Sequence, residues 1–363
     1  MAARIAVKAP QSAAQAVAAR IVRHNGMPLR LEDRADGSVN WVEPAARRDG
    51  RPSGGADESR YVRREARKVS AYVSSDVGCR MGCAMCWLTA EGATRSAPAT
   101  LERYVAQLSR VVSHYAGLVA AGEPAARDLY VNFMARGDAL ANPVVLFRYG
   151  ELYDAMAAAA AAAPGEAPGG LALRMNVSSI FPRTVPRGAD GAPDLGRVFS
   201  RAGPDGARVA VPVHLYYSLY SADPAVRRAL VPRAEEPERV LAALAAHQAR
   251  TGEPVTIHGA ELAGLNGTEA DARRRAAAIR ASGVWGKYNQ VRYNAHPHRA
   301  AGLAEADAAA RDFVFAEIAA ALAENARRAG REAAAGRSKQ VARVGPEALA
   351  SCGTFVTDPG APA

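Results

Sequence analysis

Three of the four cysteines in this 363-residue chain lie within one stretch of eight residues, "CRMGCAMC". Cys79, Cys83 and Cys86 have the spacing C-x3-C-x2-C. A tetrahedral zinc site takes four ligands, commonly in two C-x2-C pairs, and the chain has neither a second pair nor a histidine at ligand spacing from these cysteines. Three thiolates on one tight loop instead fit a 4Fe–4S cluster, in which each iron takes one cysteine. Three protein ligands would leave the fourth iron open to a small molecule.

The fourth cysteine, Cys352 in "SCGTF", lies almost at the other end of the chain. A long chain with so few cysteines is not typical of an extracellular disulfide scaffold. By residue type alone, Cys352 fits a small buried hydrophobic residue.

The composition is that of a globular protein, with 49% hydrophobic and 23% charged residues. The net charge of +10 fits a polyanionic partner such as RNA, although the excess of arginine and alanine also fits the bias of a GC-rich genome. No apolar run reaches the roughly 18 residues that span a bilayer, and the N-terminus lacks the apolar core of a signal peptide. We therefore expect a cytoplasmic protein that does not bind a membrane.

Six β-rich runs alternate with helical patterns from about residue 69 onwards. This alternation predicts an α/β fold with a parallel sheet and right-handed crossovers. Six units fall short of the eight that close a barrel, so we expect a TIM-like partial (β/α)6 barrel over residues 69–300. The predicted strands are 70–75, 129–135, 171–178, 211–220, 254–262 and 288–294, and the predicted helices are 99–121, 147–163, 224–231, 236–250 and 268–282.

Two shorter regions flank the predicted barrel. Residues 1–68 read as an accessory segment with an amphipathic helix at 12–24, two strands within 27–44 and a mobile loop at 46–60 that is rich in Gly, Pro and Ser. Residues 301–363 read as a helix at 303–334 and a tail that carries Cys352. The cysteine loop follows the first barrel strand, at the end where barrels bind ligands.

The C-x3-C-x2-C motif after the first strand of a partial barrel resembles the radical S-adenosylmethionine (SAM) enzymes. Met85 stands where that superfamily usually has an aromatic residue. The longer segment "YVSSDVGCRMGCAMC" closely resembles the RlmN/Cfr-type RNA methyltransferases, and further similar blocks follow in the same order up to about residue 355. Among them, "SLYSADPAVRRALVP" is similar to the family's "SLHAPNDELRxxLVP", and "GPEALASCG" to its "GDDIDAACG".

The resemblance implies a set of functional residues. Cys79, Cys83 and Cys86 would be the cluster ligands, and Cys352 would be the methyl-carrying cysteine. The SAM contacts would come from "RGDAL", "NVSSIFP", "SLY" and "RYNAHP", and they are Gly137, Asp138, Asn176, Ser218, Leu219, Tyr220 and Asn294.

The resemblance also implies a reaction and its partners. One SAM would methylate Cys352. A second SAM, cleaved reductively at the cluster, would give the 5′-deoxyadenosyl radical that takes hydrogen from this methyl group, and the carbon would then add to an sp2 carbon of an RNA adenine. The partners would be rRNA or tRNA and an electron donor such as flavodoxin or ferredoxin.

The chain departs from the family pattern at several positions. The family's second reactive cysteine falls on Tyr72, seven residues before Cys79, so the usual disulfide-dependent release of product lacks its partner. The general-base glutamate matches either Glu43 or Glu58, and His258 stands where the family has glutamate. The N-terminal portion is also shorter than the family's RNA-binding part. These departures keep open a diverged radical SAM methyltransferase that acts on a small molecule or peptide, and a non-enzymatic iron–sulfur sensor.

Overall fold

The computed structural model describes residues 20–22, 29–32, 37–46, 52–90, 92–294 and 302–341. Eleven of the strands form one sheet in the order β1-β2-β3-β4-β5-β6-β7-β10-β11-β12-β13. Their bounds are β1 Arg20–Val22, β2 Leu29–Glu32, β3 Val39–Ala46, β4 Pro52–Glu65, β5 Lys68–Val73, β6 Asp128–Phe133, β7 Ala172–Ser179, β10 His214–Ser218, β11 Val255–Ala260, β12 Gly286–Val291 and β13 Lys339–Gln340.

The six predicted barrel strands are confirmed as β5, β6, β7, β10, β11 and β12, each parallel to the next. Their side chains alternate, because successive residues of a strand point to opposite faces. One face carries fully buried apolar residues such as Val131 and Phe133. The other face carries polar residues such as Asn132, Asn176 and His214, which line the interior of the partial barrel.

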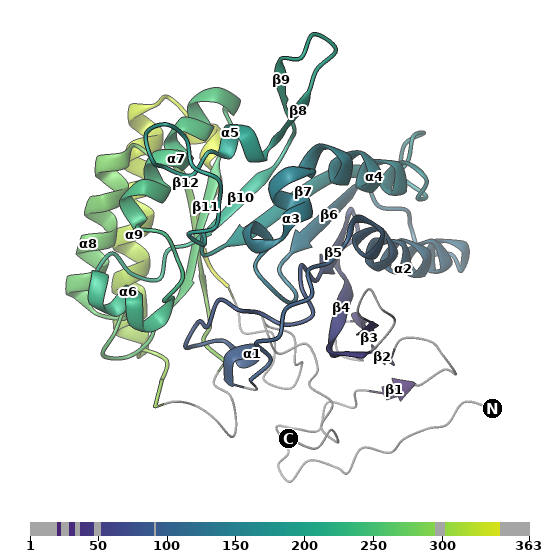
Figure 1. Cartoon of the computed structure of the whole chain (residues 1–363), viewed down its shortest axis with the longest axis horizontal. Coiled ribbons are helices and arrows are strands. Elements are labelled where there is room, and N and C mark those ends of the chain that lie inside the picture. The colour runs from purple at the N-terminus through teal and green to yellow at the C-terminus, as the bar shows by residue number, and fades with distance from the viewer. Residues whose placement is uncertain are drawn as a thin grey trace.

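Helices between the strands cover the apolar face. Figure 1 shows α2, α3 and α4 on one flank of the sheet and α6, α7, α8 and α9 on the other, all outside its curve. The bounds are α1 Trp87–Ala90, α2 Leu101–Ala120, η2 Ala139–Ala141, α3 Pro143–Phe147, α4 Tyr149–Ala161, α5 Leu195–Val198, α6 Pro224–Leu230, α7 Pro237–Thr251, α8 Glu269–Ser282, α9 Ala308–Arg328 and α10 Glu332–Ala335. The predicted helices therefore form, with the last one divided into α9 and α10.

Charged side chains report the curvature of the sheet. Burial, and then the charges of Arg174, Lys339 and Lys68, lower the pKa of Lys287. Lys68 lies on β5 and Lys287 on β12, with four other strands between them. A flat sheet would hold these strands roughly 24 Å apart, at about 4.8 Å per step, beyond useful electrostatic range. The sheet therefore curls into a partial barrel, and it remains open because β5 and β13 do not pair.

Two expectations for the N-terminal region were wrong. Residues 46–60 were expected to be a mobile loop, but Pro52–Glu65 forms β4, which pairs with β3 on one side and β5 on the other. Ladder hydrogen bonds to two neighbours outweigh the weak strand propensity of the Gly and Ser residues. Arg20–Val22, inside the helix expected at 12–24, is strand β1. The two strands expected within 27–44 are confirmed as β2 and β3.

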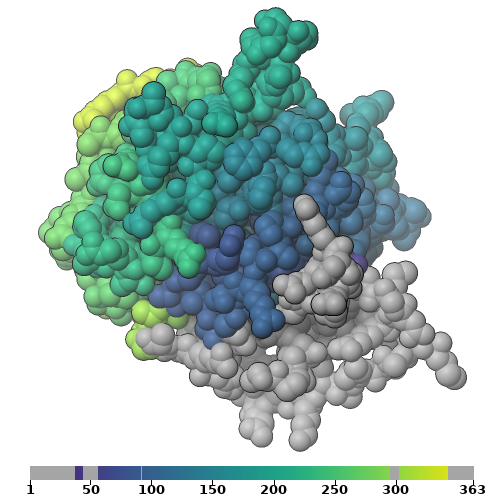
Figure 2. Space-filling model, in the orientation of Figure 1, coloured from purple at the N-terminus to yellow at the C-terminus, as the bar shows by residue number. Residues whose placement is uncertain are grey.

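One element extends away from the barrel. Strands β8 (Ser200–Ala202) and β9 (Arg208–Ala210) form a separate antiparallel hairpin, which stands out from the body in Figure 2. Among the helices that the structure describes, none combines the length and apolar character required to cross a membrane.

Candidate functional site

The cysteine loop begins where β5 ends, and main-chain hydrogen bonds fasten it to its surroundings. The amide of Cys79 donates to the carbonyl of Ala93 at 2.9 Å, and the amide of Ala84 donates to the carbonyl of Leu230 at 2.9 Å. Within the loop, the amide of Cys86 donates to the carbonyl of Cys83 at 3.0 Å. The three thiols are therefore positioned by backbone contacts to two other segments of the chain.

The three thiols are partly buried and lie close enough to affect one another. Burial raises the pKa of Cys79 to about 12. Burial also raises the pKa of Cys86. The pKa of Cys83 is raised by burial and, in addition, by the negative charges of Cys86 and Cys79. Clustered thiols that would repel one another as thiolates fit a cationic group that takes up the charge.

The type of metal group can be tested against this geometry. In the part of the chain that the structure describes, no three Cys, His, Asp or Glu side chains converge as the ligands of a single ion. A cubane cluster makes a different demand, because each cysteine binds its own iron. Three thiols on one loop, one for each of three irons, fit that demand.

A small apolar cluster packs the cysteine loop against the carboxyl ends of the barrel strands. It is separate from the main core, and it unites the loops that follow β7, β10, β11 and β12. Cys79, Cys83 and Met85 contact it from the cysteine loop, and Tyr220 contacts it from the loop after β10. Its buried members are Met81, Ile180, Leu230, Val231, Ala234, Ala260, Leu262 and Tyr293.

Gly137 and Asp138 lie at the end of β6, beside the cysteine loop. Gly137 has φ +81°, and a Cβ there would lie 2.7 Å from the Cβ of Asp76, so only glycine fits. Asp138 Oδ1 accepts hydrogen bonds from Leu140 N at 2.9 Å and Ser179 Oγ at 2.7 Å, while Oδ2 accepts from Ile180 N at 2.9 Å.

The Asp138 side chain is partly buried, and its charge reaches the thiols of Cys79 and Cys83. Burial raises its pKa to about 6, although hydrogen bonds from Ser179 and two amides favour the charged form. A negative Asp138 in turn raises the pKa of Cys79 and Cys83. Asp138 therefore caps η2, as its position in the sequence allowed, and it also lies within electrostatic range of the candidate cluster.

Ser218, Leu219 and Tyr220 take three different directions at the end of β10. Ser218 Oγ lies 2.8 Å from Nε2 of His258, which is also 3.0 Å from Ser178 Oγ. Leu219 is fully buried in the main core. Of the three, Tyr220 is the residue that packs beside the cysteine loop. Burial lowers the pKa of His258 to about 4, so this imidazole is neutral and serves as a hydrogen-bond partner.

Asn176 and Tyr72 lie on the inner wall of the barrel, before the strand ends. Asn176 is buried, and its Nδ2 donates to Asn132 Oδ1 at 2.8 Å. Arg174 Nε donates to Asn176 Oδ1 at 3.3 Å. Tyr72 pairs in register with Asn132, one strand away from Asn176. The Asn176 side chain, which was expected to contact SAM, therefore faces the interior of the barrel rather than the cysteine loop.

Asn294 follows β12 and is joined to the cysteine loop through Trp87. The indole Nε1 of Trp87, the residue after Cys86, donates to the carbonyl of Asn294 at 2.9 Å. The structure thus gathers the cysteines, Asp138, Tyr220 and Asn294 at one end of the barrel. Cys352, the expected methyl carrier, lies outside the described residues.

The two candidate glutamates have different surroundings. Glu43 is 41% exposed and pairs with Arg110 on α2, outside the barrel. Glu58 is 2% exposed and its Oε1 lies 2.5 Å from Arg136 Nη2. Burial outweighs the pairing with Arg136 and raises the pKa of Glu58 to about 7.

Arg136 is a site residue that motif matching missed. Its Nη1 donates to the carbonyl of Val77, just before the cysteines, at 3.4 Å. Its charge also lowers the pKa of Cys86, against the larger effect of burial. Arg136 therefore connects buried Glu58 to the cysteine loop. Its position directly before Gly137-Asp138 in "ARGD" was the available signal.

No protein-family model matches the chain. In sequence, it is 30% identical over 217 residues to a protein named probable dual-specificity RNA methyltransferase RlmN 1, from Opitutus terrae. The match covers 59% of this chain and 51% of that protein, so the chain spans about half the length of the curated relative it matches.

A solved structure resembles the whole barrel. The chain is similar to the crystal structure of a radical SAM methyltransferase from Sphaerobacter thermophilus, with a TM-score of 0.61 and 20% sequence identity. The match covers 90% of this chain and 80% of the other. The two proteins therefore share a fold.

Proposed function

We propose that the chain is a radical SAM methyltransferase of the RlmN type that acts on an adenine of RNA. The observation that carries the proposal is the loop after β5. Cys79 and Cys83 pack against the apolar cluster at the ends of four barrel strands, and the charge of Asp138 reaches both of these thiols. The basic net charge of +10 favours a polyanionic substrate.

Cys79, Cys83 and Cys86 would hold a 4Fe–4S cluster, and the ends of β6, β10 and β12 would hold SAM. When bound, the cluster would supply the electron that cleaves SAM reductively. Asp138 offers carboxylate oxygens to the ammonium group of SAM. The apolar cluster around Met81 and Ile180 excludes water beside the thiols, which protects reactive species from side reactions.

Cys352 is the proposed methyl carrier, and it provides the first test. Replacing Cys352 with alanine should abolish methyl transfer and leave SAM cleavage in place, because the cluster ligands are untouched. Anaerobic reconstitution with SAM, followed by mass spectrometry of the protein and of added RNA, measures both. A methylated Cys352 and a new methyladenine are expected for the wild type. Full methyl transfer by the Cys352→Ala variant would exclude the methyl-cysteine route.

Glu58, rather than Glu43, is the proposed general base, because it is buried and connects through Arg136 to the cysteine loop. Glu58→Gln should slow methyl transfer by about 10²-fold or more, the usual effect of losing a general base. Glu43→Gln, which removes an exposed pair with Arg110, should change the rate little.

The pH profile of methyl transfer tests the same assignment. A base must be deprotonated, and the pKa of Glu58 is raised to about 7. The wild-type rate should therefore rise as the pH increases through about 7, and this rise should be absent in Glu58→Gln. Iron content and unfolding temperature of the variant control for loss of the Arg136 pair. An unchanged profile in Glu58→Gln would refute the role.

A second candidate is a radical SAM methyltransferase that acts on a small molecule or peptide. The observation that favours it is Tyr72, which takes the place of the second reactive cysteine. The four cysteines of the chain are the three in the loop and Cys352. Tyrosine cannot form the disulfide that releases an RNA adduct. A methylated Cys352 without any RNA product, under conditions in which SAM is cleaved, would favour this candidate.

A further inference from the structure

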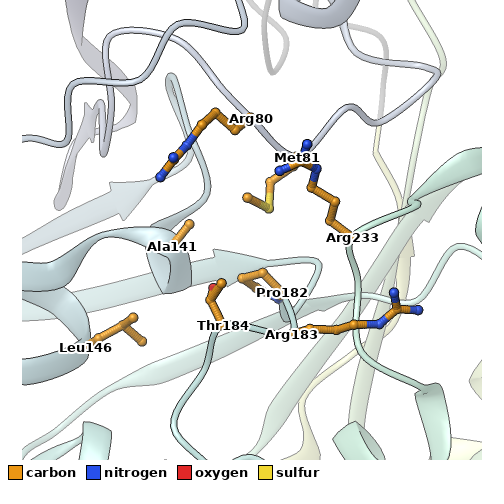
Figure 3. A pocket seen from close by; sticks show the side chains of 8 residues that line it. All are labelled: Arg80, Met81, Ala141, Leu146, Pro182, Arg183, Thr184 and Arg233. Carbon is orange, nitrogen blue, oxygen red and sulfur yellow. The ribbon is translucent and has the colours of Figure 1, made fainter.

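A pocket of about 420 Å³ opens beside the cysteine loop. It combines cationic with apolar side chains, and Figure 3 shows how they lie. Arg80 and Met81 come from the cysteine loop itself, between Cys79 and Cys83. The other residues used below come from α3, from the loop after β7 and from the loop after α6, and they are Leu146, Pro182, Arg183 and Arg233.

The positive charge of the pocket is largely uncompensated. No carboxylate lines it. Arg183 Nη2 makes a pair with Glu236 Oε1 at 3.4 Å, in which both side chains are about half exposed. Arg80 and Arg233 are exposed and form no ion pair or side-chain hydrogen bond with any residue that the structure describes. The guanidinium groups of Arg80 and Arg233 are thus available to an anion beside the cysteine loop.

The main chain that carries two of the arginines is held in place before any ligand binds. The amide of Arg183 donates to the carbonyl of Arg233 at 3.1 Å, and Pro182 bridges Ala234 in antiparallel fashion. The turn that leads into this segment is strained, because Phe181 has φ +56°, a conformation that disfavours bulky side chains. Ser179 Oγ fixes this turn by accepting from the Phe181 amide at 2.7 Å.

The same segments touch the cysteine loop. The carbonyl of Leu230, three residues before Arg233, accepts from the amide of Ala84. Arg233 is therefore tied to the loop that carries Cys83, and Arg80 belongs to that loop. A group bound between these arginines therefore lies beside the cysteine loop.

The chemistry of the lining identifies the ligand class. Guanidinium groups recognise phosphate with paired hydrogen bonds, which gives geometric specificity as well as charge. The side chains of Met81, Leu146 and Pro182 offer an apolar wall that suits the flat faces of a sugar and base. A volume of about 420 Å³ lies within the range of about 300–1,000 Å³ typical of small-ligand sites.

We propose that this pocket binds a nucleotide unit of the substrate, with Arg80 and Arg233 on its phosphate and Met81, Leu146 and Pro182 against its nucleoside. The proposal rests on the proposed function, because it takes the face of the cysteine loop as the reaction face. It goes further in naming a phosphate subsite and the side chains that form it. A free nucleotide and a nucleotide within RNA share this chemistry.

The test is a binding measurement on the full chain with its cluster reconstituted. The probes are a fluorescent single-stranded oligoribonucleotide, AMP and adenosine. Arg80→Gln and Arg233→Gln should each weaken binding of a phosphate-bearing probe by about tenfold or more, as expected for a charge-assisted contact. The double variant should also lower the slope of log K against log salt concentration for the oligonucleotide by about 1.4, or about 0.7 for each lost contact.

Matched controls keep the result specific. Arg327→Gln makes the same charge change at an exposed position on α9, and it should leave binding within about twofold of the wild type, since a distant exposed charge is largely screened by salt. Arg233→Lys keeps the charge but not the planar fork, so its loss should be intermediate. Adenosine, which has no phosphate, should bind the wild type and Arg233→Gln equally. Equal iron contents show that the Arg80 change leaves the cluster intact.

The outcomes distinguish a free nucleotide from RNA as the ligand. They also distinguish failure of the pocket assignment from failure of the proposed function. Competition by AMP assigns the pocket to a free nucleotide, and binding of the oligonucleotide alone assigns it to RNA. Failure of the wild type to bind either probe, or equal binding by wild type and double variant, overturns the pocket assignment. Loss of binding in the variants without any methylated product from the wild type overturns the proposed function alone. Methylation with an unchanged KM in the double variant overturns the pocket alone.

Discussion

Cys83→Ala should yield a folded protein that holds little iron and neither cleaves SAM nor transfers a methyl group. Each cysteine of a three-ligand loop binds its own iron, so removing one leaves the cluster without a stable set of ligands. Burial and the negative charges of Cys86 and Cys79 all raise the pKa of Cys83, so its thiol lies near the other two. We expect activity below detection, and this is the largest effect among the predictions.

The chain provides its own control for this experiment. Cys352→Ala also removes one thiol, but it should keep the iron and the cleavage of SAM. Iron analysis, the visible absorption of the reconstituted protein and the yield of 5′-deoxyadenosine distinguish the two variants. A Cys83→Ala protein with full iron and normal SAM cleavage would contradict the assignment of the loop as the cluster site.

Arg275→Met should lower the free energy of unfolding by about 3–5 kcal/mol, the usual effect of removing one member of a buried ion pair. Arg275 on α8 is fully buried. Its Nη2 lies 2.9 Å from Glu261 Oε2 and donates to the carbonyl of Asn266 at 2.7 Å. Its Nε lies 2.7 Å from Asp271 Oδ2. The change would leave two carboxylates buried without their cation.

The same helix provides the matched control. Arg273, two residues earlier, pairs with Glu269 at 2.9 Å, but both side chains are more than 60% exposed. Arg273→Met should therefore cost about 1 kcal/mol or less. Chemical denaturation of the two variants measures the difference. Equal stabilities would show that the Glu261 network contributes no more than a surface pair.

The barrel was predictable from the sequence, because its signals are local. Each of the six strands is a short β-rich run, and a helical pattern separates most of them from the next strand. The cysteine spacing was equally local.

Other features depend on contacts between distant segments, and these were not predictable. The segment "PSGGADESRYVRRE" has the composition of a loop, and it becomes β4 because β3 and β5 bind it from both sides. Glu43 and Glu58 were equivalent candidates until the fold buried one with Arg136 and turned the other toward Arg110. The pocket arginines come from three loops, which main-chain hydrogen bonds join: Arg183 N donates to Arg233 O, and Ala84 N donates to Leu230 O.

The pairing of β4 with β5 limits how much of the N-terminal region can be removed without exposing the edge of β5. β5 leads directly into the cysteine loop, and β4 covers its outer edge along almost its whole length. A chain trimmed to begin at Lys68 would present the bare main-chain groups of β5 to solvent, and uncovered edges of this kind recruit other strands. The accessory strands therefore shield this edge from self-association, and trimming them would favour aggregation beside the cysteine loop.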